Sequence, residues 1–239
     1  MTTLEQTPAP AAAPPGPSTR EIDAVRISTR FGIAFALCQL GTMVLMAIFV
    51  LPHGGSPGDP ALERGHRVLD AADLYRAGNY VFMMSGVLLL GFLGAVRARL
   101  RHVDPSGALA TIAVAAGTLL ALIWPLAGVL HDVALDTAQD GTDLRILGGW
   151  DAVAPYSLAF SALPRLFLVG ALVLSLRATG TAPWLQRIGV VILVLSMVGS
   201  ATLLAGALFP VLALSTLTYE LWIGAVAWHW LRADRQLGS

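Results

Sequence analysis

The sequence contains no lysine and few charged residues of any kind. Its fifteen basic residues are all arginine, and charged residues make up 13% of the 239 positions. Globular domains carry about 25% charged residues, so this chain is not an ordinary soluble protein. Basic and acidic residues balance to a net charge of zero, and the arginines form no cluster of the kind that binds nucleic acid. We therefore expect no nucleic-acid partner.

Cysteine and common catalytic motifs are also scarce. The single cysteine, Cys38, excludes an intramolecular disulfide and a cysteine-based metal site. The chain has no His-Glu-x-x-His, no Gly-x-Ser-x-Gly and no Walker-type or dinucleotide-binding glycine loop. The five histidines have no spacing that specifies haem or metal ligation. We expect no cofactor, no catalytic residue and no metal ligand, and we favour a protein that is not an enzyme.

Hydrophobic residues, in contrast, make up 56% of the chain, and the mean hydropathy is +0.70. They gather in stretches of about 18–23 residues, which is the length that an α-helix needs to cross a bilayer. The sequence therefore predicts an all-α membrane protein with a bundle of six transmembrane helices. The expected spans are Phe31–Leu51, Asn79–Val96, Ala108–Leu130, Tyr156–Leu176, Ile188–Leu208 and Leu212–Leu231.

The two ends of the chain differ from this apolar centre. Residues 1–18 contain five prolines among alanine, threonine, serine and glycine, a composition that cannot bury enough apolar surface to fold. We expect residues 1–25 to be a disordered Pro/Ala-rich tail, residues 26–232 to form the transmembrane domain and residues 233–239 to be a short tail. No cleavable signal peptide is visible, because apolar sequence begins only at Phe31.

The distribution of the arginines predicts the orientation. An N-terminus in the cytoplasm places ten arginines in inner segments, four in outer loops and Arg165 inside the membrane. Inner loops of membrane proteins are enriched in arginine and lysine, so we expect both termini in the cytoplasm and the protein in a bacterial plasma membrane. The ten inner residues are Arg20, Arg26, Arg30, Arg97, Arg99, Arg101, Arg177, Arg187, Arg232 and Arg235.

Two charged residues interrupt the apolar stretches at matching depth. Arg165 lies about nine residues into the fourth span and Glu220 about eight residues into the sixth, which is roughly 12–14 Å below the same membrane face. A lone charge in the bilayer centre costs about 2.5–3.5 kcal/mol, so opposite charges at one depth are expected to meet inside the bundle. The pair has two interpretations, a structural ion pair that docks two helices or part of a ligand, ion or proton site.

Other polar residues fall in the outer half of the same bundle and are candidates for the same site. Asn79 and Tyr80 lie in the second span, His131 and Asp132 end the third, and Tyr219 lies beside Glu220. The ordinary interpretation of a tyrosine at a helix end is an interfacial anchor. Together with Arg165 and Glu220 they form the predicted ligand-binding or ion-binding set.

Three features of the outer segments give local expectations. Asp59 and Pro60 read as the N-cap and first residue of a short surface helix. The acidic residues of the second outer loop, which recur at helical spacing, are expected to face water; they are Asp132, Asp136, Asp140 and Asp143, with Asp151 following. A tight turn at Pro210 is expected to separate the fifth and sixth spans.

The region from about Arg30 to Arg232 resembles the uncharacterised six-helix integral membrane proteins of bacteria, of the actinobacterial type, that are grouped as domains of unknown function. Six evenly arranged spans, an acidic second outer loop and a charge at mid-depth in the fourth and sixth spans carry the resemblance. The use of arginine without lysine fits a GC-rich genome. The resemblance implies a plasma-membrane protein and no particular activity.

We interpret the chain as a multi-pass membrane protein that binds or moves a small solute or ion around Arg165 and Glu220. One alternative is an intramembrane enzyme or a redox protein that holds haem. Another is an accessory subunit of a membrane complex, with its outer loops docked on another subunit. The expected partners are the lipid bilayer, a small solute or ion, and a second membrane protein or another copy of this chain.

Overall fold

The computed structural model describes residues 19–45, 48, 59–141, 143–151 and 153–236, and within these ranges the chain forms helices and no strand. Two single-turn 3-10 helices, η3 (Ala201–Leu203) and η4 (Gly206–Leu208), precede the last helix. The α-helices are α1 (Thr19–Leu45), α2 (Ala61–Asp70), α3 (Ala72–Val103), α4 (Ala108–Gln139), α5 (Leu144–Asp151), α6 (Val153–Ala178), α7 (Pro183–Ser200) and α8 (Phe209–Gln236).

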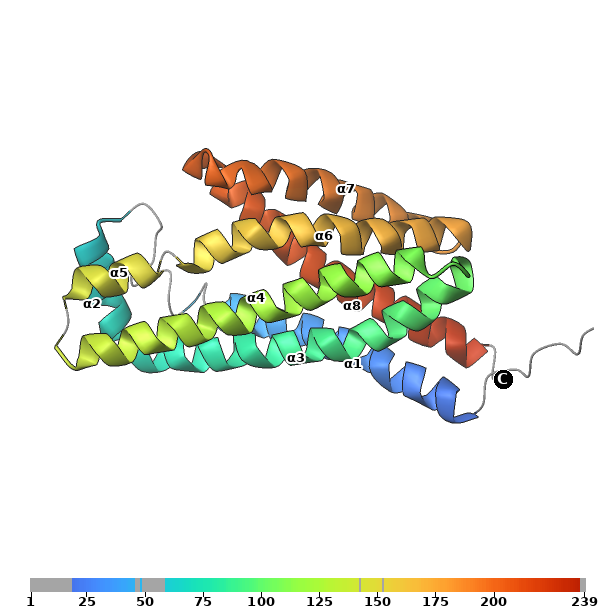
Figure 1. The fold of residues 1–239 in the computed structure, drawn as a ribbon, viewed down its shortest axis with the longest axis horizontal. Coiled ribbons are helices and arrows are strands. Elements are labelled where there is room, and N and C mark those ends of the chain that lie inside the picture. The colour runs from blue at the N-terminus through green and yellow to red at the C-terminus, as the bar shows by residue number, and fades with distance from the viewer. Residues whose placement is uncertain (1–18, 46–47, 49–58, 142, 152, 237–239) are drawn as a thin grey trace, which may run out of the picture.

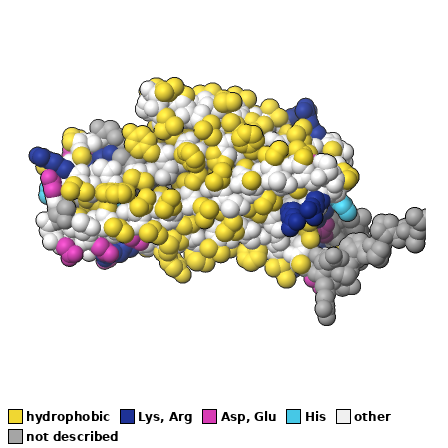
Figure 2. Space-filling view, viewed as in Figure 1, with side chains coloured by type: hydrophobic (Ala, Val, Ile, Leu, Met, Phe, Trp, Pro, Cys, Tyr) yellow, Lys and Arg dark blue, Asp and Glu magenta, His cyan; other side chains and the backbone are white. Residues whose placement is uncertain are grey.

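In the described part of the chain, six helices are long and apolar enough to cross a membrane, namely α1, α3, α4, α6, α7 and α8. Figure 2 shows an apolar band across the visible face of the molecule, with charged side chains gathered at its two ends. Large apolar side chains such as Leu126 and Phe167 point outward from this band. Only lipid tails make such exposure favourable, so the chain is a multi-pass membrane protein, as predicted.

The six long helices form a closed ring. Each packs against the next in the order α1, α3, α4, α6, α7, α8, and α8 returns to α1. The two short helices, α2 and α5, pack against each other at one end of the bundle (Figure 1). The start of α1, the connections α3–α4 and α6–α7 and the end of α8 lie at the opposite end. The segments that carry the ten arginines of the predicted inner side therefore share one end of the molecule.

The helices extend beyond the apolar stretches from which they were expected. The second predicted span, Asn79–Val96, lies inside the 32-residue α3, and the third continues to Gln139 in α4. The first helix begins at Thr19, inside the expected tail, while residues 1–18 and 237–239 lie outside the described residues. An α-helix satisfies its own backbone hydrogen bonds, so polar turns continue it past the edge of the hydrocarbon.

Two local expectations need correction. The short helix α2 exists, but Pro60 occupies its N-cap position and Asp59 forms an ion pair with Arg67 at 2.7 Å instead of capping. The turn between the last two spans consists of η3 and η4, and Pro210 is the second residue of α8. Proline is accepted in the first turn of a helix because the N–H that it lacks has no partner there.

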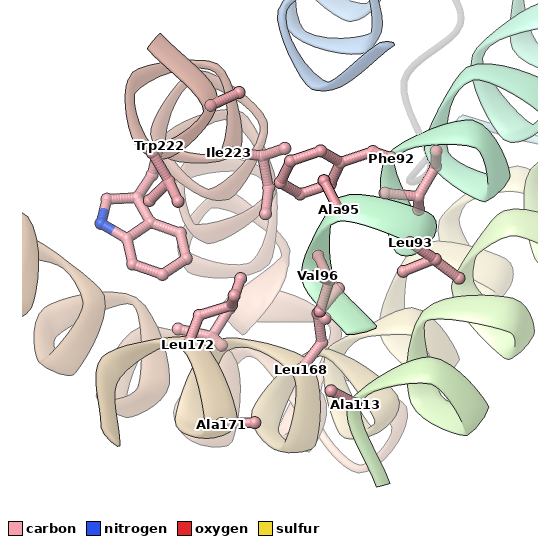
Figure 3. Close-up of a cluster of buried hydrophobic side chains, with 14 of the residues drawn as sticks. Phe92, Leu93, Ala95, Val96, Ala113, Leu168, Ala171, Leu172, Trp222 and Ile223 are labelled. Atoms are coloured by element: carbon pink, nitrogen blue, oxygen red, sulfur yellow. The ribbon is translucent and has the colours of Figure 1, made fainter. Parts of the chain in front are cut away.

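The apolar core fills the half of the bundle nearer the arginine-rich end. Figure 3 shows α3, α6 and α8 meeting there through side chains that include Phe92, Leu172 and Trp222. The indole N–H of Trp222 donates to the carbonyl of Leu185 at 2.9 Å and fastens α8 to α7. The buried polar residues lie mainly deeper in the bundle and toward its other end, where two separate clusters form.

Candidate functional site: two buried polar clusters

The first cluster surrounds Arg165 at the interface of α6 and α8. The side chain is 1% exposed, and its terminal nitrogens donate to three hydroxyl groups. Nη2 donates to Ser161 at 2.9 Å and to Thr216 at 3.0 Å, and Nη1 donates to Ser215 at 3.1 Å. The guanidinium carbon lies 4.9 Å from the ring centroid of Tyr219, a cation–π contact. Hydroxyl groups and a ring face, without a carboxylate, hold this buried cation.

The three hydroxyl groups can accept hydrogen bonds from Arg165 because each donates its own proton to a backbone carbonyl. Ser215 and Thr216 both donate to the carbonyl of Leu212, at 2.8 and 2.9 Å, and Ser161 donates to the carbonyl of Leu158. A hydroxyl oxygen that donates to its own helix still has lone pairs for an N–H donor. The sequence Leu-Ser-Thr therefore turns one face of α8 into a set of acceptors for Arg165.

Glu220 lies one helical turn beyond these hydroxyl groups on the same face of α8 and is 2% exposed. The expected ion pair is not formed, because among the described residues no nitrogen of Arg165 comes within 4.0 Å of a carboxylate oxygen. The two charges remain close enough to affect each other electrostatically. The guanidinium of Arg165 instead donates its hydrogen bonds to Ser215 and Thr216, which lie one helical turn before Glu220 on α8.

Four buried polar atoms in this region have no hydrogen-bond partner among the described residues. They are Nε of Arg165, the hydroxyl of Tyr219, Oε2 of Glu220 and Nε2 of Gln39 on α1. Added Cβ atoms on Gly224 and Gly32 would meet Ala36 and Ala227 at 2.6 and 2.9 Å, so α1 and α8 pack antiparallel.

One helical turn from the contact between Ala36 and Gly224, this antiparallel register places Gln39 of α1 level with Glu220 of α8. The four unpartnered atoms thus come from α1, α6 and α8 and lie in the interior of the bundle. Buried polar groups are paired in more than about 90% of cases, so these four atoms are candidates for contact with a water, an ion or a solute.

The second cluster lies at the junction of α3, α4 and α5, toward the end that carries α2. Asn79 donates to Oδ1 of Asp132 at 2.7 Å, and the same amide nitrogen lies 3.2 Å from Nδ1 of His131. Nε2 of His131 lies 3.8 Å from Oδ1 of Asp151. Arg64 holds the other oxygen of Asp151 in a buried ion pair at 2.6 Å. The structure therefore joins five polar residues from four helices.

The hydrogen bonds determine the tautomer of His131. Because Asp132 accepts from Asn79, the amide nitrogen faces both neighbours and Nδ1 of His131 has to accept. In the neutral imidazole the proton is then on Nε2, which points toward Asp151 and has no hydrogen-bond partner among the described residues. A water or hydroxyl group between these atoms would accept from the Nε2–H of His131 and donate its O–H to Oδ1 of Asp151.

A small cavity of about 60 Å³ lies beside this cluster. Asn79, His131 and Asp151 supply its polar lining, and Phe82 stacks on Trp124 with 5.4 Å between their ring centroids to close its apolar side. A water needs about 10–15 Å³ of such space, so the cavity accommodates several waters or a very small solute. Among the described residues no group of three or more His, Cys, Asp and Glu side chains is placed to hold a metal ion.

Two glycines bring Arg64 and Asp151 together. An added Cβ on Gly65 would come within 1.9 Å of the carbonyl oxygen of Leu144, and one on Gly148 within 1.8 Å of that of Ala61. The absence of side chains at both positions lets the backbones of α2 and α5 touch. The ion pair between Arg64 and Asp151 forms across this contact.

The predicted site residues thus divide into two groups. Asn79, His131 and Asp132 belong to the second cluster, whereas Arg165, Tyr219 and Glu220 belong to the first. Tyr80 belongs to neither, because its side chain points outward and is 60% exposed.

Sequence analysis missed Arg64 and Asp151, which it treated as charges of the outer loops. Gly65, which follows Arg64, and Gly148, which precedes Asp151, could have indicated this contact in the sequence. A glycine within a helix indicates a close approach of another backbone. The acidic residues of the second outer loop were expected to face water, but Asp151 is buried and Asp132 is half-buried against Asn79.

No protein-family model, no curated protein and no solved structure matches this chain. The resemblance to six-helix bacterial membrane proteins therefore remains an expectation from the sequence. Function has to be argued from the two clusters themselves.

Proposed function

We propose that this membrane protein binds or moves a small polar solute or ion at the cluster around Arg165 and Glu220. The observation that carries the proposal is the separation of these two buried charges, each of which keeps an atom without a partner. An intramembrane charge is costly, and a direct ion pair would be the simplest way to reduce the cost. A site that leaves the pair open supports a role in binding.

The available atoms indicate what such a ligand has to offer. Nε of Arg165 and Nε2 of Gln39 are donors, Oε2 of Glu220 is an acceptor, and the hydroxyl of Tyr219 can act as either. A ligand that combines acceptors with a donor or a positive charge would satisfy them. Small zwitterionic and dipolar solutes have this combination, and so does a hydrated monovalent ion.

The arginine distribution supports the orientation that belongs to this proposal. The segments with ten arginines share one end of the bundle and the segments with four share the other. We infer that the arginine-rich end faces the cytoplasm of a bacterial cell and that both termini lie there. Accessibility labelling of single cysteines introduced at Ser106 and at Gly149 in a Cys38→Ala background would test this, with reaction from outside expected only at position 149.

The binding proposal is tested by thermal unfolding of the purified protein in detergent with a panel of alkali chlorides, sodium phosphate and zwitterionic amino acids. At least one of these probes should raise the melting temperature of the wild type by binding to the folded state. Tyr219→Phe removes one unpartnered hydroxyl and Glu220→Gln removes the charge, and both should abolish the shift. Tyr156→Phe, at an exposed tyrosine, is the matched control and should retain it.

The same variants separate binding from folding. Without a ligand, Tyr219→Phe should be as stable as the wild type or more stable, because an unpartnered buried hydroxyl is removed. If no probe in the panel shifts the wild type, or if the shift persists in both Tyr219→Phe and Glu220→Gln, the proposal is wrong.

A further inference from the structure

Another cavity lies away from both polar clusters, at the arginine-rich end of the bundle. It is a cleft of about 330 Å³ between the end of α3 and the beginning of α4. Small side chains of α4 leave the space open, and two arginines of α3 line the other side. The lining residues are Arg97, Arg101, Ala110, Thr111, Val114 and Ala115.

The two arginines lie one helical turn apart on the same face of α3, and both are exposed. Neither forms an ion pair or a hydrogen bond with another described residue. Arg99, between them in sequence, points another way and forms an ion pair with Asp234. The acidic residue nearest the cleft along the chain, Asp104, accepts hydrogen bonds from Ser106 and from the backbone N–H of Leu109. No described carboxylate therefore forms an ion pair with either arginine of the cleft.

Two guanidinium groups at this spacing have a preferred ligand. The guanidinium fork matches the oxygens of a phosphate, and a second arginine one turn away can reach the same group. Thr111 donates its hydroxyl proton to the carbonyl of Gly107 at 2.9 Å, so its oxygen remains an acceptor for a headgroup hydroxyl. The chemistry of the cleft fits a phosphate that carries a hydroxylated substituent.

The surroundings of the cleft indicate where the phosphate comes from. Leu90 shares the face of α3 with Arg97, and Leu119 shares the face of α4 with Ala115. Both leucines are exposed on the apolar band. A ligand whose phosphate lies between the arginines would therefore continue along an apolar surface toward the centre of the membrane. This is the shape of a phospholipid.

We propose that the cleft between α3 and α4 binds the headgroup of an anionic phospholipid, with its phosphate on Arg97 and Arg101 and its acyl chains along Leu90 and Leu119. This site is independent of the solute site around Arg165. Basic pockets between transmembrane helices bind anionic headgroups, and each arginine near an anionic surface strengthens the binding.

The test compares binding of phosphatidylglycerol and phosphatidylcholine to the full chain in detergent, measured by native mass spectrometry of the protein–lipid complexes. The wild type should prefer phosphatidylglycerol. The double variant Arg97→Gln/Arg101→Gln should bind phosphatidylglycerol about tenfold or more weakly and bind phosphatidylcholine unchanged. Ala115→Phe, which fills the cleft without a change of charge, should also weaken phosphatidylglycerol binding.

The matched control is Arg177→Gln/Arg187→Gln, which removes two exposed arginines from the same end of the bundle but outside the cleft. It should retain the preference of the wild type. The proposal is overturned if this control loses as much binding as the cleft variant, or if the wild type does not discriminate between the two lipids. Competition by millimolar glycerol 3-phosphate would also overturn it, because the ligand would then be a soluble phosphate.

Discussion

Arg64 and Asp151 form a buried ion pair in which Nε and Nη2 of the arginine both donate to Oδ2 of the aspartate, at 3.1 and 2.6 Å. The pair joins two short helices that the sequence places about eighty residues apart. Because one carboxylate oxygen takes both hydrogen bonds, Oδ1 of Asp151 remains directed at His131. The ion pair thus orients the carboxylate of the second cluster as well as fastening α2 to α5.

Breaking this ion pair from one side should be more harmful than removing it. Arg64→Leu or Asp151→Leu leaves a buried charge without its partner, so each should lower the free energy of unfolding by about 3–5 kcal/mol. The double variant should recover most of the loss. Chemical unfolding in detergent measures all three. Arg67→Gln, which removes the more exposed ion pairs with Asp59 and Glu63 on the same helix, is the control and should cost about 1 kcal/mol or less. Equal losses in the single and double variants would contradict this prediction.

The contact between α2 and α5 should depend on Gly148. In Gly148→Ala the new Cβ would approach the backbone oxygen of Ala61 to 1.8 Å, and backbone cannot move aside as a flexible side chain can. We expect a loss of about 1–3 kcal/mol and faster hydrogen exchange in α2. Gly149→Ala is the control, because no atom lies within 4 Å of its added Cβ. If both alanine variants exchange like the wild type, the close backbone contact is wrong.

The hydroxyl group of Thr216 should matter for the burial of Arg165. Thr216→Val has nearly the same shape but removes an acceptor of a buried cation, so stability should fall by about 1.5–3 kcal/mol. Thr218→Val is a matched control on the same helix, since among the described residues its hydroxyl bonds to the carbonyl of Leu214 alone. The control should change stability by less than about 0.5 kcal/mol. Melting curves of the two variants side by side decide whether the hydroxyl groups hold the arginine.

Asp104, in the connection between α3 and α4, should make stability depend on pH in the acid range. Hydrogen bonds from the Ser106 hydroxyl and from the backbone N–H of Leu109 lower the pKa of its carboxyl group. A lowered pKa in the folded state gives stability that is fully present above the unfolded pKa of about 4 and is lost as pH falls through the folded pKa.

The stability difference between the wild type and Asp104→Asn should therefore disappear at low pH and be constant at neutral pH. Unfolding measured from pH 2 to pH 7 follows this difference. Asp140→Asn, at the other end of α4, is the control: its side chain accepts no hydrogen bond from a described residue. A difference for Asp104→Asn that persists unchanged at the lowest pH would contradict the stabilising role of these hydrogen bonds.

The sequence predicted well what depends on local composition. The apolar stretches gave six helices because an apolar run of this length has no stable place except a membrane or a core. The prediction of helix ends was less successful, because α3 and α4 continue through polar turns. The predicted cap at Asp59 was also wrong, because its carboxylate forms an ion pair with Arg67 and does not cap α2. Helix continuation and capping compete within about 1 kcal/mol, which a residue pattern does not resolve.

The sequence by itself determined that Arg165 and Glu220 would be buried, because charges within apolar spans turn inward. Tertiary structure alone decided their partners. The rotation of α8 about its axis directs Ser215 and Thr216, and not Glu220, at the guanidinium of Arg165. The glycines of α2 and α5 allow the close helix contact that brings Arg64 to Asp151. Such choices depend on the relative rotation and spacing of helices distant in the chain. A shift of a few ångströms, about one helical turn, decides between an ion pair and an open site.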